Sequence, residues 1–147
     1  MIIITIATTR DEPGPNGWAA IIRTQTRSRT MRGGDSDTTP GRMALVAAIE
    51  SIRSLPSGTR ATLVSESRRM IRALTSGWIV RAAGRGFVSE DDSPVSDSDL
   101  WAALLAELAT RDITFELIRP GSGIQDGKRA VAAARKSVPA TARRWTV

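Results

Sequence analysis

Apolar and polar residues alternate along this chain with two different periods, which indicates both strands and helices. Ile2 to Thr8 is β-branched and mostly apolar, as in a buried central strand. Trp18 to Arg23 and Thr26 to Met31 predict a hairpin whose outer strand, with alternating Thr and Arg, faces water on one side. Turn-forming residues from Pro13 to Gly17 precede this hairpin, and Gly33 to Pro40 is expected to be a polar connection.

The second half of the chain mixes helical and strand patterns. From Arg42 to about Leu55 the apolar residues recur at i, i+3, i+4 and i+7, so one face of a helix is expected to pack on a sheet. The following elements are predicted in chain order: a strand at Ala61 to Ser65, a short helix capped by Ser67, a helical piece from Trp78, a helix capped by Ser98, a strand at Ile113 to Ile118, and a helix at Asp126 to Val138. This alternation predicts an α/β fold with a mixed sheet and helices on its faces.

The length of 147 residues fits one domain with its own core. We expect this domain to span residues 1–139 and residues 140–147 to form a basic, loose tail. The apolar run at the start of the chain is only six residues long and has no basic flank, so it resembles neither a signal peptide nor a membrane span. A cytoplasmic protein is expected.

Composition narrows the chemistry that the chain could perform. It contains no cysteine and no histidine, which excludes disulfides, thiolate metal sites and the usual general base. Any catalysis would therefore depend on carboxylates. The net charge of +6 favours polyanionic partners, although 19 of the 21 basic residues are arginine and a GC-rich genome would give the same bias.

Three motifs resemble ribonuclease H type 1. They are the P-G-P-N-G-W turn, the helix T-T-P-G-R-M-A-L-V-A-A-I-E-S-I from Thr38 to Ile52, and the stretch from Trp78 to Trp101, which starts W-I-V-R and ends D-L-W. The resemblance covers nearly the whole chain and implies a five-stranded mixed sheet in the order 3-2-1-4-5. It also implies an enzyme that hydrolyses the RNA strand of an RNA/DNA hybrid with two divalent ions held by four carboxylates.

Three of these four carboxylates are missing from their expected positions. Thr9 stands where the family has the Asp of T-D-G, Ala44 replaces the Glu that follows Arg-Met, and Ala130 occupies the place of the last Asp. Only Glu66 is retained. Mg²⁺ needs several oxygen ligands, so the sequence predicts a pseudoenzyme without metal or cofactor.

Relocated ligands remain an alternative. Asp126 lies one helical turn before Ala130, and Asp11 and Glu12 follow the first strand, so a nuclease with a rebuilt metal site stays open as a third hypothesis.

The resemblance also implies contacts to nucleic acid. The residues that would surround the family's substrate groove are Arg10, Thr39, Arg68, Trp78, Arg81 and Arg85. We therefore expect a protein that binds nucleic acid or a nucleoprotein assembly, while Trp101 is expected to pack in the core. A protein-interaction module is the alternative, since the loop with Glu90, Asp91 and Asp92 is acidic where the family is basic.

Overall fold

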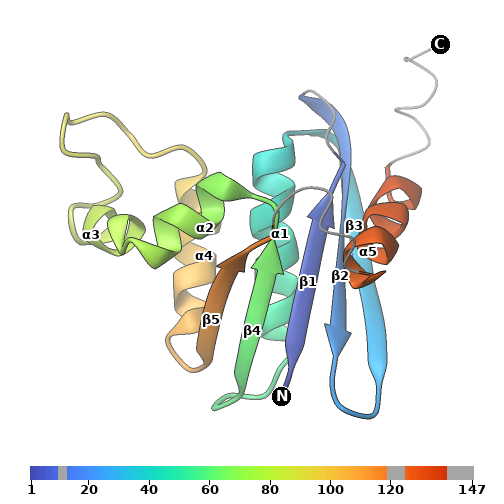
Figure 1. Ribbon diagram of the computed structural model, residues 1–147. Helices are drawn as coiled ribbons and strands as arrows, with labels where there is room; N and C mark the ends of the chain where they lie inside the picture. Colours follow the sequence, from blue (N-terminus) through green and yellow to red (C-terminus); the bar gives the residue numbers. More distant parts are fainter. Residues whose placement is uncertain (10–12, 119–124, 139–147) are drawn as a thin grey trace.

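The computed structural model describes residues 1–9, 13–118 and 125–138, which form a five-stranded sheet and five helices (Figure 1). The elements are β1 (Ile3–Thr8), β2 (Gly14–Arg23), β3 (Ser28–Thr38), α1 (Pro40–Arg53), β4 (Arg60–Ser65), α2 (Arg68–Thr75), α3 (Trp78–Gly84), α4 (Ser98–Leu108), β5 (Asp112–Leu117) and α5 (Gln125–Lys136). The strand order is β3-β2-β1-β4-β5. β1, β2 and β3 pair antiparallel, while β4 and β5 run parallel to β1. The predicted fold class and strand order are confirmed.

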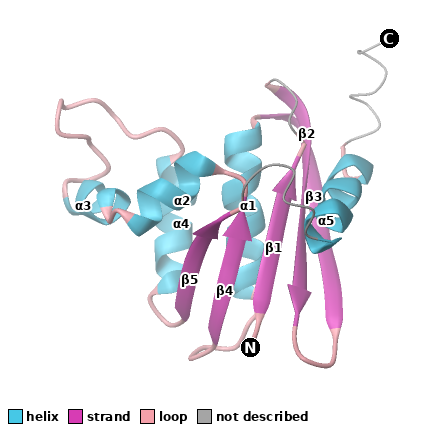
Figure 2. Cartoon of the chain, viewed as in Figure 1, coloured by secondary structure: helices cyan, strands magenta, loops and turns pink. Residues whose placement is uncertain are grey.

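Helices cover both faces of the sheet (Figure 2). The side chains buried on the two faces differ in size. On one face, α1 and α4 pack over large aliphatic side chains such as Ile4, Ile22 and Leu63 to form the main core. On the other face, α5 lies across β1 and β2 and buries only the small residues Ala130 and Ala134 of its own. The alternation of side chains along the strands separates these two layers.

The bounds of the two strands at one edge of the sheet differ from the prediction. β2 begins at Gly14 rather than Trp18, with a register shift between Gly14 and Asn16, and β3 continues to Thr38 instead of ending near Met31. Neighbouring elements cause the difference. A Cβ on Gly33 would lie 2.6 Å from the Trp18 ring nitrogen, and the backbone next to it pairs with β2. Glycine at position 33 therefore allows the Trp18 ring to approach the backbone of β3, although glycine has a low propensity to form strands.

Two helix starts also differ from the prediction: α1 begins at Pro40 rather than Arg42, and the cap of α4 is shifted by one residue. Thr39 caps α1, with its Oγ1 accepting a hydrogen bond from the Arg42 amide at 3.1 Å. The cap position of α4 is Asp97, in a left-handed conformation, and Ser98 is already the first helical residue. Arg42 donates to Asp97 and Asp99 at 2.9–3.1 Å, which ties the start of α4 to α1. None of the helices in the described part of the chain has the length and apolar character needed to cross a membrane.

Candidate functional site

A pocket of about 230 Å³ lies where β1 and β4 end and where α1 and α2 begin. Its lining includes Thr8 from β1, Ala44 from α1, and Ser65 and Glu66 after β4. Because β1 and β4 are parallel, their carboxyl ends meet at the same edge of the sheet, which is where open α/β sheets bind ligands. The structure thus brings together two of the four expected catalytic positions, Ala44 and Glu66.

Thr9 follows β1 and belongs to a buried, neutral hydrogen-bond network. Its hydroxyl donates to Asn16 Oδ1 at 2.8 Å and accepts from the Gly17 amide at 3.2 Å. Thr9 is 4 % exposed and Asn16 is fully buried, with the Asn16 amide donating to the Thr38 carbonyl at 3.3 Å. A residue that must both donate and accept in this place suits threonine, whereas an ionised aspartate has no proton to donate.

The fourth position, Ala130, is fully buried on the sheet-facing side of α5 and is not among the residues that line the pocket. Asp126, the possible substitute ligand, receives two hydrogen bonds of 2.6 Å from Arg23 instead. These bonds hold the pKa of Asp126 below its ordinary value. Asp126 is therefore committed to holding α5 against the end of β2.

The paired ions implied by the resemblance do not fit these residues as a four-carboxylate cluster. Within residues 1–9, 13–118 and 125–138, no group of three or more His, Cys, Asp or Glu side chains is placed to hold a metal ion. Glu66 is the one carboxylate in the pocket lining, and a divalent cation prefers several oxygen ligands. We therefore assign no metal ligand set. Asp11 and Glu12 lie outside the described residues.

Two further depressions continue from this pocket along α2. A small one of about 30 Å³ shares Gly41 and Ser67 with the first pocket and includes Arg69. A larger one of about 430 Å³ also includes Arg69 and is lined by Arg72, Ala73, Ser76, Trp78 and Arg81. Because each depression shares lining residues with the next, we treat the three together as one surface, which we call the site groove. It runs from the strand ends to Trp78.

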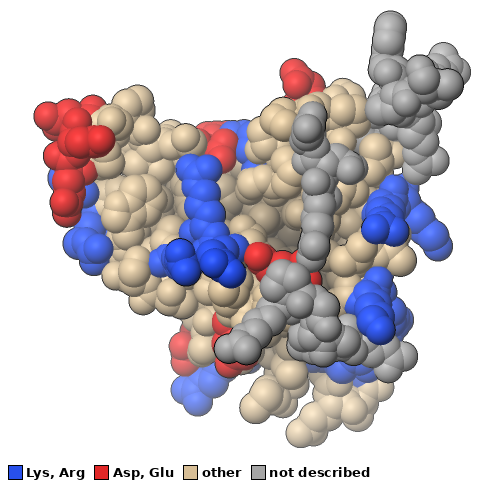
Figure 3. Space-filling view, turned by 45° about the horizontal axis from the view of Figure 1, so that its top comes forward, with Lys and Arg blue, Asp and Glu red and all other residues tan. Residues whose placement is uncertain are grey.

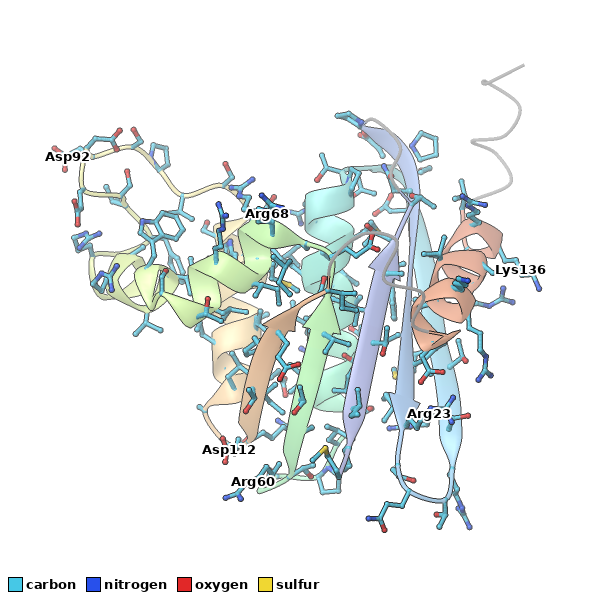
Figure 4. All side chains as sticks on the ribbon, in the orientation of Figure 1. Arg23, Arg60, Arg68, Asp92, Asp112 and Lys136 are labelled. Atoms are coloured by element: carbon cyan, nitrogen blue, oxygen red, sulfur yellow. The ribbon has the colours of Figure 1, made fainter. Side chains whose placement is uncertain are left out.

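Positive charge accompanies the site groove. Figure 3 shows basic side chains gathered over α2 next to the hollowed part of this face, while acidic side chains cluster at the tip of the loop beyond α3. Arg68, at the exposed start of α2, points outward above the sheet (Figure 4). The arginines at the Trp78 end of the site groove attract a polyanion, whereas Glu66 and Asp97 add negative charge to its other two depressions.

The predicted contact residues occupy different places in this arrangement. Trp78 and Arg81 line the site groove, and Arg81 also donates to the Ser76 carbonyl at 3.2 Å. Arg85 is exposed and donates to the Val88 carbonyl at 3.2 Å, outside the groove lining. The hydroxyl of Thr39 is used as the helix cap, and Arg10 lies outside the described residues.

The sequence reasoning missed two residues of the site groove, Arg69 and Arg72. Both are exposed on α2, and they stand three positions apart, so they share a helix face. Extending that spacing by four residues leads to Ser76, which also lines the groove. The helical period places these residues on one face of α2. The direction of that face, toward Trp78, comes from the structure.

Known proteins similar to this chain were found by sequence. The model of the RNase H family matches residues 1–138. A protein named Ribonuclease H from Thermus thermophilus is 33 % identical over 131 residues, covering 89 % of this chain and 79 % of that protein. A protein of the same name from Bordetella bronchiseptica is 32 % identical over 131 residues, covering 89 % of this chain and 84 % of its own length.

Solved structures show the same fold at lower sequence identity. LC9-RNase H1, described as a type 1 RNase H with the type 2 active-site motif, has a TM-score of 0.76 at 18 % identity, covering 99 % of this chain and 80 % of its own. LC11-RNase H1, solved in complex with an RNA/DNA hybrid, has a TM-score of 0.71 at 15 % identity, covering 94 % of this chain and 96 % of its own.

The prediction of a pseudoenzyme is wrong in the light of these relatives. Proteins named Ribonuclease H that are about a third identical over most of the chain indicate an enzyme. The loss of acids from the motif positions therefore does not by itself establish an inactive protein.

Proposed function

Because this chain belongs to the ribonuclease H family, we propose that it binds an RNA/DNA hybrid along the site groove and hydrolyses the RNA strand. The observation that carries the proposal is that the three depressions of the groove adjoin one another. Residues shared between neighbouring depressions connect the pocket of Glu66 with the arginine-lined depression of Trp78. One bound duplex can therefore contact both ends of it.

Each part of the groove has a chemical role in this proposal. The half-buried ring of Trp78 offers a face on which a base or sugar of one strand stacks, and such contacts contribute about 1–3 kcal/mol each. Arg69, Arg72 and Arg81 surround that ring and contact phosphates, which positions the duplex without reading its sequence. Recognition of a hybrid then depends on shape and backbone more than on bases.

The pocket at the strand ends is where the proposal places the reaction. Glu66 is the carboxylate of its lining, and Ser65 and Ser67 contribute hydroxyl groups beside it. Glu66 is thus the residue that we assign to hydrolysis.

Two measurements on the purified protein test the proposal. Fluorescence anisotropy with a labelled RNA/DNA hybrid at low salt is expected to give saturable binding that Trp78→Ala weakens by roughly 5- to 150-fold and Trp78→Phe weakens much less. Thermal unfolding of both variants controls for folding. Absence of any affinity for the hybrid would refute the binding part.

The reaction is tested by following a labelled RNA strand on gels with Mg²⁺ or Mn²⁺ present. We expect fragments of the RNA strand with wild-type protein and their loss with Glu66→Gln, whose shape is preserved while its charge is removed. Hybrid binding without RNA cleavage under either cation contradicts the assignment of hydrolysis and leaves the binding assignment standing.

A further inference from the structure

Helix α5 presents four basic side chains on its exposed side. They are Lys128, Arg129, Arg135 and Lys136. Residues seven positions apart differ by only about 20° around a helix, so Lys128 lies in line with Arg135 and Arg129 in line with Lys136. The exposed residue Ala132 lies between these lines. We call these four side chains the α5 stripe.

The opposite side of α5 fixes the direction in which the α5 stripe faces. Ala130 and Ala134 are buried against the sheet, and a Cβ on Gly17 would lie 2.2 Å from the Ala134 carbonyl oxygen. At the start of the helix, Asp126 binds Arg23 through two hydrogen bonds of 2.6 Å. The helix therefore cannot roll, and its basic side chains point to solvent.

Most of the positive charge of the α5 stripe is not neutralised by nearby acidic residues. Arg129 lies 3.7 Å from Asp126, whose two oxygens already accept the hydrogen bonds of Arg23. In the described part of the chain, no ion pair is formed by Lys128, Arg135 or Lys136. A surface with this excess of positive charge suits a polyanion.

The α5 stripe and the site groove lie toward the same side of the molecule. Figure 3 shows basic side chains both over α2 and over α5, and acidic side chains are visible between the two groups. The acidic tip of the loop beyond α3, labelled at Asp92 in Figure 4, lies at the far end from α5. A long nucleic acid that leaves the groove is therefore repelled at one end and attracted at the other.

We infer that the α5 stripe is a second contact surface for nucleic-acid phosphates, which extends the bound length beyond the site groove. From Lys128 to Lys136 the helix rises about 12 Å, and a duplex presents one phosphate charge for about every 1.7 Å of its axis. Several phosphates thus face the stripe at once. The contacts carry charge but no base recognition, so they act on any duplex that is long enough.

This inference rests on the proposed function, because the duplex is first placed by the site groove. It predicts that affinity depends on length. We expect a hybrid of about 8 base pairs to contact the groove alone, and one of about 24 base pairs to contact α5 as well and to bind with a steeper dependence on salt.

The experiment compares two double variants with equal loss of charge. Lys128→Gln with Arg135→Gln removes one line of the stripe, and Arg27→Gln with Arg60→Gln removes two exposed arginines from the turn after β2 and the start of β4. Figure 4 shows Arg60 at the opposite end of the sheet from the groove. Anisotropy titrations with both hybrids over a range of salt give the affinities and the slopes.

For the long hybrid, we expect the stripe variant to bind about 10-fold more weakly and to lose about 1–2 from the slope of log K against log salt. Its affinity for the short hybrid stays within about twofold of wild type, and the control variant changes neither by more than that. Equal loss in both variants, or wild-type binding of the long hybrid by the stripe variant, overturns the inference. Failure of the wild-type protein to bind the short hybrid instead refutes the site groove, so the two failures are distinguishable.

Discussion

The backbone of Gly17 in β2 lies directly under the carbonyl of Ala134 in α5. A Cβ built on Gly17 would come within 2.2 Å of that oxygen, which is closer than any side chain tolerates. The residue after α5 approaches Gly34 of β3 in the same way, where a Cβ would lie 2.1 Å from the Ser137 carbonyl oxygen. Two glycines from neighbouring strands thus set the distance between the sheet and α5.

Gly17→Ala is expected to lower the free energy of unfolding by about 2–4 kcal/mol, because α5 must move away from β2. Gly84→Ala is the matched control, since open space surrounds Gly84 at the end of α3, and it should change stability by no more than about 1 kcal/mol. Urea unfolding followed by circular dichroism measures both. Equal stability of the two variants would show that α5 is not seated on Gly17 as described.

Thr9→Val tests the neutral network at the end of β1. The substitution keeps the shape but removes the hydroxyl that donates to Asn16 and accepts from Gly17, so two buried polar groups lose a partner. We expect a loss of about 1–3 kcal/mol in the free energy of unfolding. Thr9→Ser retains the hydroxyl and should lose less. A larger loss for Thr9→Ser would indicate that the methyl group matters more than the hydrogen bonds.

The ion pair of Asp126 and Arg23 predicts a dependence of stability on pH. Hydrogen bonds from Arg23 hold the pKa of Asp126 below its ordinary value of 3.8, so the pair stabilises the fold above that value. The contribution is lost as the pH falls through the lower pKa of the folded state, because the carboxyl group is then protonated while Arg23 stays charged.

The measurement is the melting temperature of wild type and Asp126→Asn between about pH 6 and pH 2. Wild type should be more stable near pH 6, and the difference should shrink as the pH falls below 3.8. Asp112→Asn serves as a control, because Asp112 and Arg60 are both exposed and such pairs contribute little. A difference that is constant over the whole range would contradict the assigned pair.

Ala44→Glu places a second carboxylate in the pocket that Glu66 lines. Two acids close together repel each other, and a divalent cation that binds between them relieves that repulsion. We therefore expect Mn²⁺ to raise the melting temperature of Ala44→Glu more than that of wild type or of Ala44→Gln, which has the same size and no charge. Equal shifts in all three proteins would place residue 44 out of reach of any ion bound near Glu66.

The order of the sheet was predictable because its central strands and main helices carry strong periodic patterns. The apolar residues of α1 and α4 repeat with the helical period, and β1 and β4 are apolar and β-branched. The extent of β3 was not predictable, since Gly33, Gly34 and Asp35 have low strand propensity. They pair with β2 only because Trp18 and α5 approach closely there, which is a property of tertiary neighbours.

The candidate site was predictable in part for a similar reason. Ala44 and Glu66 were expected near each other and line one pocket, while Trp78 and Arg81 line the groove that continues from it. Arg69 and Arg72 were missed because charged residues on a helix usually face water, and only the packing of α2 beside α3 turns these two toward Trp78. Inactivity was wrongly inferred, since a motif lists residue types at fixed positions and does not describe the whole pocket.

The two helical layers that pack on the sheet differ in how easily they detach from it. Separating α1 from the sheet exposes several large aliphatic side chains, whereas separating α5 exposes mainly small residues together with Ile21 of β2, which is worth less in hydration free energy. Brief detachment of α5 while the rest stays folded is therefore expected to cost less free energy than detachment of α1. When it happens, the layer over β1 and β2 is bare while the groove along α2 remains intact.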